Sequence, residues 1–537
     1  MDFQSLLQQF LSGSVAQQAS TYSSLFVFAP ELVLSLSIVL MLLARLTDCD
    51  RYIPTCWITL LGGMSSFMIV LYQFWQMKVG AALPVEIFTG VAVHDAFSIF
   101  FRGFLSFFLV FVTVLTVLTG IPDDEDAPDF YSLLSGAVIG MMLMSSANHL
   151  LMLFVGVEMA SVPSYALTGF LKGRRQSSES ALKFVVYGAG AAGVMLFGIS
   201  LLAGLLGTAE FPELARRFQV IFAGHTGMQD PIARCVMLAL LMISVGFAFK
   251  LSAVPFHFWA PDAFQGASAE VGGFLSVASK AAAFALLVRF TLELTGDATG
   301  ASKGLALTCG IALGFIATLT STFGNLAAYS QRNMKRMLAY STIAHAGYML
   351  MAVSALLVLH SGNAAPEAGH RAIMGLLYYL SVYLFMNLGA FAIVAFIRNQ
   401  TFSEEIEDYK GVWQQSPILA VCMAICLFSL VGIPPLGGFY GKAFIFAALF
   451  DATRVHWFMW VVLIGGGVNT VISLFYYLRV AKYMCIDERP IDAPELTLTA
   501  NSLPGKYVML LSGMVVLLGI VINPLSEVAL YAARSLL

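Results

Sequence analysis

The sequence carries little charge. Only 11% of its 537 residues are Asp, Glu, Lys or Arg, whereas 59% are hydrophobic. Soluble domains carry about 25% charged residues, so the composition excludes an ordinary soluble enzyme or binding domain. The net charge of −3 gives no indication of a nucleic-acid partner. We therefore expect an all-α, polytopic membrane protein in contact with the lipid bilayer.

Cysteine is also scarce and scattered. The seven cysteines form no spacing typical of a metal site or a disulfide framework, and Cys422 and Cys426 fit small core residues one helical turn apart. The chain has no G-x-G-x-x-G after a strand, no P-loop and no Fe–S spacing. We expect no cofactor and no metal to be bound by this chain. The opening MDFQSLLQQFLSGS lacks a basic segment, so no cleaved signal is expected.

Apolar runs long enough to span a bilayer recur about fourteen times. They lie near residues 25–45, 57–77, 97–120, 130–147, 150–171, 182–206, 233–252, 268–294, 304–324, 337–358, 372–397, 417–450, 456–480 and 507–530.

The stretch GFAFKLSAVPFHFWAPDAFQGASAEVGGFLSVASKAAAF interrupts the seventh span and carries two lysines, Lys250 and Lys280. Pro255 and Pro261 lack an amide donor, so a regular helix is not expected to continue through them. A charged side chain at bilayer depth costs at least ~2.5–3.5 kcal/mol. A broken membrane helix is tolerated where protein or a water-filled cavity satisfies its backbone. The combination indicates a buried, hydrated ion path.

A second interruption, Gly432-Ile433-Pro434-Pro435, lies in the twelfth span. Interrupted segments in corresponding places of two halves are typical of inverted repeats. We therefore predict two inverted five-helix repeats, helices 4–8 and 9–13, with helices 7 and 12 broken. The predicted divisions are 1–128 for helices 1–3, 129–294 for the first antiporter-like repeat, 295–485 for the second, and 486–537 for the C-terminal loop and helix 14.

Alternate loops differ in basic charge. If the N-terminus lies outside the cytoplasm, the loops on the cytoplasmic side carry more Lys and Arg than the loops on the other side. The excess is clearest in the short loops LKGRRQSS and QRNMKR. Positive loops face the cytoplasm, so both termini are expected outside.

Four charges lie deep in apolar spans: Glu158, Lys250, Lys280 and Lys442. For Glu158 the alternative is a structural salt bridge to a lysine. For Lys250 the alternative is snorkelling to the interface, a route that hardly serves the central Lys280. Such isolated charges favour a proton relay.

Further polar residues have two readings each. Lys183 belongs to the relay or snorkels beside its basic loop, and His345 links two ion paths or is a packing residue. Arg102 is expected to form a structural pair with Asp95.

Around the first break, His257 and Asp262 are expected to fix its geometry. Tyr379, Tyr383 and Asn387 are candidates for the polar lining of a path.

Coupling between such charges follows from electrostatics. Two opposite charges ~7 Å apart at an effective dielectric of ~20 interact by roughly 2.4 kcal/mol. A proton that moves at one site therefore changes the proton affinity of the next site, and the titrations are coupled.

The motifs resemble subunit N of the proton-pumping NADH:quinone oxidoreductase, respiratory complex I. The resemblance covers essentially the whole chain, through APELVLSLSIVL, GVEMASVPSYALTGF, the first break, KRMLAYSTIAHAGYML and LVGIPPLGGFYGKAFIF. It implies that Glu158, Lys250, Lys280 and Lys442 are the buried acid and lysines of that family. The sister subunit M is expected to have a glutamate in place of Lys442.

The resemblance also implies a function and its setting. We expect a proton-translocating subunit of the cell inner (plasma) membrane, with other membrane subunits of the complex as partners and protons as its cargo. NADH, FMN, Fe–S clusters and quinone are expected in other subunits. One departure is Ser268-Ala269-Glu270, where the family usually reads Pro-Thr-Pro. It adds a carboxylate near the first path.

Two other functions remain at this point. A cation/proton antiporter subunit without redox coupling shares the helix plan. A passive scaffold is disfavoured by so many buried lysines.

Overall fold

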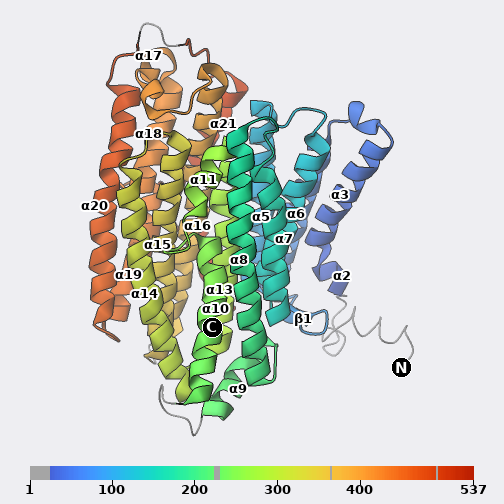
Figure 1. Ribbon diagram of the computed structural model, residues 1–537, viewed down its shortest axis with the longest axis vertical. Helices are drawn as coiled ribbons and strands as arrows, with labels where there is room; N and C mark the ends of the chain where they lie inside the picture. Colours follow the sequence, from blue (N-terminus) through green and yellow to red (C-terminus); the bar gives the residue numbers. More distant parts are fainter. Residues whose placement is uncertain (1–23, 223–229, 363–365, 491–493, 537) are drawn as a thin grey trace.

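Membrane-length helices form nearly the whole molecule, drawn in Figure 1. The computed structural model describes residues 24–222, 230–362, 366–490 and 494–536. The opening segment, on which the signal expectation rested, lies outside these ranges. The first seven spans are α3 (Ala29–Leu46), α4 (Thr55–Lys78), α5 (Ala96–Thr119), α6 (Ala127–Ser146), α7 (Leu150–Thr168), α8 (Arg175–Leu206) and α10 (Pro231–Leu251).

The eighth span is built from three consecutive pieces: α12 (Ala269–Phe274), the π-helical turn η3 (Leu275–Ser279) and α13 (Lys280–Thr295). The later spans are α14 (Ala301–Ala328), α15 (Met334–Ser361), α16 (Pro366–Thr401), the pair α18 (Pro417–Val431) and α19 (Gly437–Thr453), α20 (Phe458–Cys485) and α21 (Leu503–Ile520). In the described residues, 13 helices are long and apolar enough to cross a membrane, and the interrupted twelfth span adds one more. The predicted helical membrane fold is confirmed.

Both predicted interruptions are present. The seventh span stops at Leu251, and the chain resumes helical structure as α11 (Trp259–Gly266). The twelfth span stops at Val431 and resumes at Gly437. Pro261 does not interrupt a helix, because it occupies the first turn of α11, where its missing N–H leaves no bond unmade. The division into two repeats stays a prediction.

Three spans form the centre of the bundle. Every residue in the apolar windows of the eighth span, α15 and α16 is buried, against 28–33% of the residues in the windows of α3, α10 and α20. Large hydrophobic side chains such as Trp57, Leu61 and Val471 are exposed on the outer helices, as expected for surfaces that face lipid. Polar groups on the three central spans are therefore sealed from the bilayer.

The basic loops share one end of the molecule. The backbone N–H of Met334 donates to Glu404, and Arg479 donates to the carbonyls of Tyr329 and Gln331. These bonds join the loop before α15 to the segment that precedes η4 (Ile406–Tyr409) and to α20. The next element, α17 (Val412–Gln415), lies at the top of Figure 1, whereas α9 lies at the bottom. The loop ends alternate as predicted; which end faces the cytoplasm stays a prediction.

The structure adds elements that hydropathy did not predict. The strands β1 (Val85–Ile87) and β2 (Ala92–His94) pair antiparallel, with Glu86 opposite Val93. The remaining short pieces are α2 (Ser24–Val27), η2 (Cys49–Arg51), α9 (Phe211–Phe222) and α22 (Asn523–Arg534). The fourteenth span, expected to run to 530, ends at Ile520, because Asn523-Pro524 starts α22 in a new helix.

Candidate functional site

Glu158 and Lys250 come from two different spans, α7 and α10, and interact electrostatically. Lys250 is the last residue but one of α10 and only 5% exposed, so it does not snorkel to water. Glu158 is half-buried near the middle of α7. Their charged atoms form no ion pair within 4 Å in the described structure. The two groups therefore interact through their charges without forming a direct ion pair.

Lys280 binds the interrupted end of α10. Its Nζ donates to the backbone oxygen of Leu251 at 2.9 Å and to Oγ of Ser252 at 3.1 Å. The last carbonyls of a helix have no partner within the helix and carry the negative end of its dipole. The ammonium of Lys280, which is 2% exposed, satisfies these groups. The break in the seventh span thus creates the binding site of the lysine.

Lys442 binds the interrupted end of α18 in the same way. Its Nζ donates to the backbone oxygens of Leu430 at 3.0 Å and Val431 at 2.9 Å. The ammonium also lies 4.2 Å from the centre of the Tyr348 ring, a distance at which a cation is attracted to the aromatic face. Gly432 follows with φ +92°, which glycine adopts without strain. The C-terminal carbonyls of each interrupted helix are therefore bound by a buried lysine from a later helix.

His345 uses both ring nitrogens. Nδ1 is 2.5 Å from the hydroxyl of Tyr379, and Nε2 is 3.1 Å from the hydroxyl of Tyr477. Tyr477 in turn lies 2.5 Å from Ser341. His345 also interacts electrostatically with Lys442. It is a hydrogen-bonded member of a buried polar group beside the second lysine.

One face of α16 joins the two lysine sites. Tyr379, Tyr383 and Asn387 are spaced by four residues, so their side chains lie on one face of the helix. Tyr379 contacts His345, Tyr383 donates to Thr342 at 3.1 Å, and Asn387 donates to Ser276. Ser276 lies in the π-helical turn, four residues before Lys280. We name these three side chains the α16 stripe.

Lys183 lies outside this buried group. Its side chain is 42% exposed and pairs with Glu179 and Asp262, each at 2.9 Å. Arg336 also binds Asp262, at 2.6 Å. Burial alone would raise the pKa of the Asp262 carboxyl, but the hydrogen bonds from Lys183 and Arg336 hold this pKa below its ordinary value. The cluster links α8, α11 and α15 at the basic end. A role for Lys183 in the relay stays a prediction.

His257, at the first break, is 2% exposed, with Phe258 and Phe323 each 4.3 Å from its ring centre. These contacts agree with the predicted part of His257 in fixing the geometry of the break.

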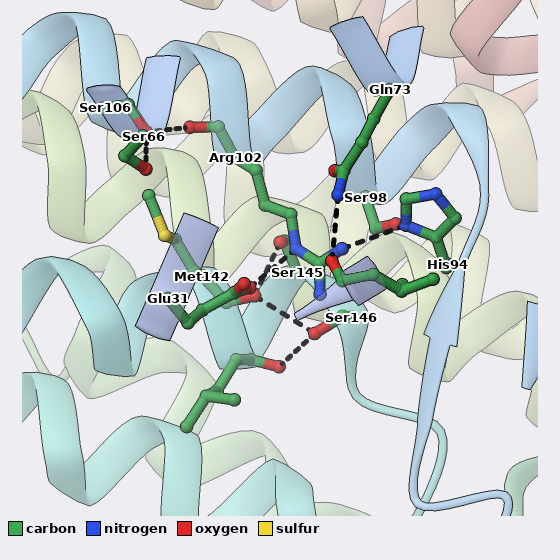
Figure 2. Close-up of polar contacts among 12 residues, drawn as sticks. Glu31, Ser66, Gln73, His94, Ser98, Arg102, Ser106, Met142, Ser145 and Ser146 are labelled. Carbon is green, nitrogen blue, oxygen red and sulfur yellow. Dashed lines mark hydrogen bonds and ion pairs between the residues drawn. The ribbon is translucent and has the colours of Figure 1, made fainter. Parts of the chain in front are cut away.

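The expected pair of Arg102 with Asp95 is wrong. Figure 2 shows Arg102 between Glu31 and His94, with its Nε 2.6 Å from the carboxylate of Glu31. Asp95 instead caps the start of α5 and binds Arg289 through two bonds of 2.9 and 3.0 Å. Sequence spacing does not show that Glu31, on α3, reaches Arg102 on α5.

Glu270, the carboxylate at the unusual Ser-Ala-Glu sequence, lies in the first turn of α12 and is fully buried. Ser268 caps this turn by accepting from the N–H of Val271 at 3.3 Å. The eighth helix therefore starts normally without the usual prolines.

In the described residues, no group of three or more His, Cys, Asp or Glu side chains comes together. The chemistry available to the site is proton transfer between carboxylate, amine, imidazole and hydroxyl groups.

The structure is a helical bundle with two interrupted spans, and a buried lysine binds the carbonyl end at each interruption. This arrangement defines an antiporter-like ion-translocating membrane subunit. The transmembrane family described as NADH:quinone oxidoreductase/Mrp antiporter matches residues 147–473. A subunit N of NADH-quinone oxidoreductase from Anaeromyxobacter sp. is 40% identical over 77% of this chain and 79% of its own length. The chain therefore belongs to the NADH-quinone oxidoreductase subunit N family and is a multi-pass protein of the plasma membrane.

Solved structures agree with this assignment. A chain of respiratory complex I from Thermus thermophilus is 28% identical, with a TM-score of 0.71 over 93% of this chain and 98% of that one. A chain of the Mrp complex from Dietzia sp. superposes with a TM-score of 0.78 but is only 19% identical, over 95% and 97% of the two chains. The second likeness shows a shared fold.

Proposed function

We propose that this chain translocates protons through Glu158, Lys250, Lys280, the α16 stripe, His345 and Lys442, as a membrane subunit of an NADH:quinone oxidoreductase. The observation that carries the proposal is the paired arrangement of Lys280 and Lys442. Each ammonium satisfies the terminal carbonyls of an interrupted helix, and the α16 stripe lies between them.

Charge compensation explains how a proton moves along this set. A lysine bound only to carbonyl and hydroxyl oxygens has no fixed counter-charge, so a change of charge nearby shifts its proton occupancy. Over ~7 Å such a change is worth roughly 2.4 kcal/mol at an effective dielectric of ~20. Glu158 exerts this effect on Lys250, and Lys442 exerts it on His345. Protonation at one end therefore favours release at the next site.

Electron transfer takes place elsewhere in this proposal. NADH oxidation and quinone reduction belong to other subunits, which hold FMN, Fe–S clusters and quinone. Conformational or electrostatic changes in neighbouring membrane subunits drive the relay. The chain is thereby a translocase component of the enzyme complex.

The test uses the native assembly in sealed vesicles. NADH and a quinone are added, and proton movement is followed with a pH-sensitive dye. We expect proton uptake to start when NADH is added, to stop when quinone reduction stops, and not to require sodium. Proton movement that is independent of NADH and depends on an imposed sodium gradient would instead assign the chain to a cation/proton antiporter.

A further inference from the structure

Tyr348 presents its ring to Lys442, and its hydroxyl is bound by two other helices. The ring is 1% exposed, and the ammonium of Lys442 lies 4.2 Å from its centre. The hydroxyl accepts from Nδ2 of Asn325 on α14 at 3.3 Å and also interacts with Thr470 on α20. A cation is attracted to the face of an aromatic ring and not to its edge, so the attraction depends on how the ring is turned. The hydroxyl contacts therefore fix the ring that the lysine meets.

Asn325 is fully buried, and both polar atoms of its side chain have partners. Its Nδ2 also donates to the backbone oxygen of Asn469 at 3.1 Å, and its Oδ1 accepts from the hydroxyl of Tyr476 at 3.0 Å. Asn469 and Tyr476 are seven residues apart on α20, so they lie on the same face of that helix. A buried polar network in which every member is bonded is rigid. Asn325 is therefore held in one orientation beside Tyr348.

A second asparagine makes the same kind of contact in the opposite direction. Asn469, which is 2% exposed, donates from Nδ2 to Oγ1 of Thr322 and to the backbone oxygen of Gly465, both at 2.8 Å. Thr322 lies on α14, three residues before Asn325. Each asparagine thus bonds across the interface between α14 and α20. We name Asn325 and Asn469 the asparagine pair.

Close packing of α14 against α15 brings Asn325 within reach of Tyr348. A Cβ added at Gly324 would lie 2.6 Å from the backbone nitrogen of Ala344, and a Cβ added at Gly347 would lie 2.6 Å from a backbone nitrogen of α14. Small residues at such interfaces let the backbones of membrane helices approach closely. Each glycine directly precedes a bonded residue, Asn325 or Tyr348. The bond between these two side chains is therefore set by backbone packing.

We propose that the asparagine pair is a positioning site for the ring of Tyr348 and, through that ring, for the ammonium of Lys442. Amide groups do not take up or release protons near neutral pH, so the pair itself carries no proton. A lysine side chain is flexible, and proton transfer requires its nitrogen within hydrogen-bond reach of the partner. The fixed ring restricts the ammonium to the carbonyl end of α18. This proposal rests on the proposed function, because Lys442 belongs to the proposed path.

The first test changes the charge on the ring face with little change in its size. Tyr348→Phe is compared with para-fluorophenylalanine and trifluorophenylalanine at the same position in the whole complex. Fluorine withdraws electrons from the ring face and weakens its attraction for a cation. We expect NADH-driven proton uptake at matched complex abundance to fall stepwise, by about threefold from phenylalanine to the trifluorinated ring. Equal uptake across the series would show that the ring only packs, and would overturn the proposal.

The second test asks whether Asn325 acts through the hydroxyl of Tyr348. Asn325→Leu keeps the approximate size of the side chain and removes the amide, so uptake should fall about fivefold, within the range for coupled groups of one network. In the Tyr348→Phe background the same change should cost less than about twofold, because the bond is already absent. A fivefold loss in both backgrounds would mean that Asn325 only stabilises helix packing, and would contradict the proposal.

Asn148 supplies the matched control, because it is also a buried asparagine but binds Glu86 and the backbone oxygen of Gly90. Asn148→Leu should leave uptake per assembled complex unchanged, and a loss as large as that of Asn325→Leu would overturn the proposal. If Lys442→Ala stops uptake while the ring series and the Asn325 variants show no effect, the proposed function stands and this inference fails. If Lys442→Ala leaves uptake normal, both fail.

Discussion

The two lysine sites share a plan but differ in how their charge is balanced. At the first break, Lys280 caps α10 beside Lys250, and Glu158 acts on Lys250. At the second, Lys442 caps α18 and faces the ring of Tyr348. The only acidic residue of α18 and α19 is Asp451, which is paired with Arg371. The first site can therefore exchange charge with an acid, whereas the second relies on dipoles and an aromatic face.

The largest effect is expected from removing either capping lysine. Lys280→Ala and Lys442→Ala should each lower NADH-driven proton uptake roughly 100-fold, the upper range for loss of a proton-transfer group being larger still. Both variants should assemble, because water can satisfy the freed carbonyls. Uptake is measured in vesicles at matched complex abundance, with the exposed Lys506→Ala as control. Normal uptake in both variants would rule out the buried-lysine path.

A smaller effect, confined to the first site, is expected at Glu158. Glu158→Gln keeps the size of the side chain but removes its negative charge, which acts on Lys250. Two opposite charges ~7 Å apart interact by roughly 2 kcal/mol at an effective dielectric of ~20, so uptake should fall about tenfold. Glu158→Asp keeps the charge and should retain more uptake. If Glu158 only stabilises the fold, both variants will lose abundance together, while uptake per assembled complex stays normal.

The connection between the sites is tested by one hydroxyl. Tyr379→Phe removes the bond to His345 and should lower uptake about fivefold, within the range for a single proton-transfer contact. The neighbouring Tyr378 is the matched control, because its hydroxyl binds the backbone oxygen of Leu518 instead. Tyr378→Phe should leave uptake unchanged. Equal losses of uptake in Tyr379→Phe and Tyr378→Phe would mean that the effect comes from altered packing and not from the loss of the bond to His345.

The smallest effect on transport is expected at the Glu31–Arg102 pair. Arg102→Met leaves the acid unpaired, which should destabilise the folded chain by about 3–5 kcal/mol. The double variant Glu31→Gln/Arg102→Met should recover most of the lost thermal stability of the complex. Uptake per assembled complex should stay within about twofold throughout. A pumping defect in the stable double variant would place this pair in the proton path.

Hydropathy predicted the spans because a bilayer requires long apolar helices with every backbone group bonded. Both interruptions were found from Pro and Gly in otherwise apolar runs. Amphipathic and extended pieces, such as α9 and the hairpin of β1 and β2, leave no such signal. The break between α21 and α22 had one, Asn523-Pro524, which hydropathy averaged over.

The buried charges were predicted from isolated Lys and Glu in apolar spans, and Tyr379, Tyr383 and Asn387 were predicted as candidates for a polar lining. Their partners were not readable. Arg102 had a nearby acid in sequence and bound a distant one, since helix packing decides which spans meet. Tyr348 and Tyr477 were missed, because a tyrosine in an apolar span carries no charge that marks it as part of a polar site.

A double-mutant cycle on Lys280 and Lys442 tests most directly whether the two sites form one path. NADH-driven uptake is measured for Lys280→Ala, Lys442→Ala and the double variant at matched complex abundance. Groups that act as a unit show strongly non-additive losses. We predict that proton uptake in the double variant is within about twofold of the uptake in the less active single variant. Losses that multiply in the double variant would contradict a single path and leave two independent sites.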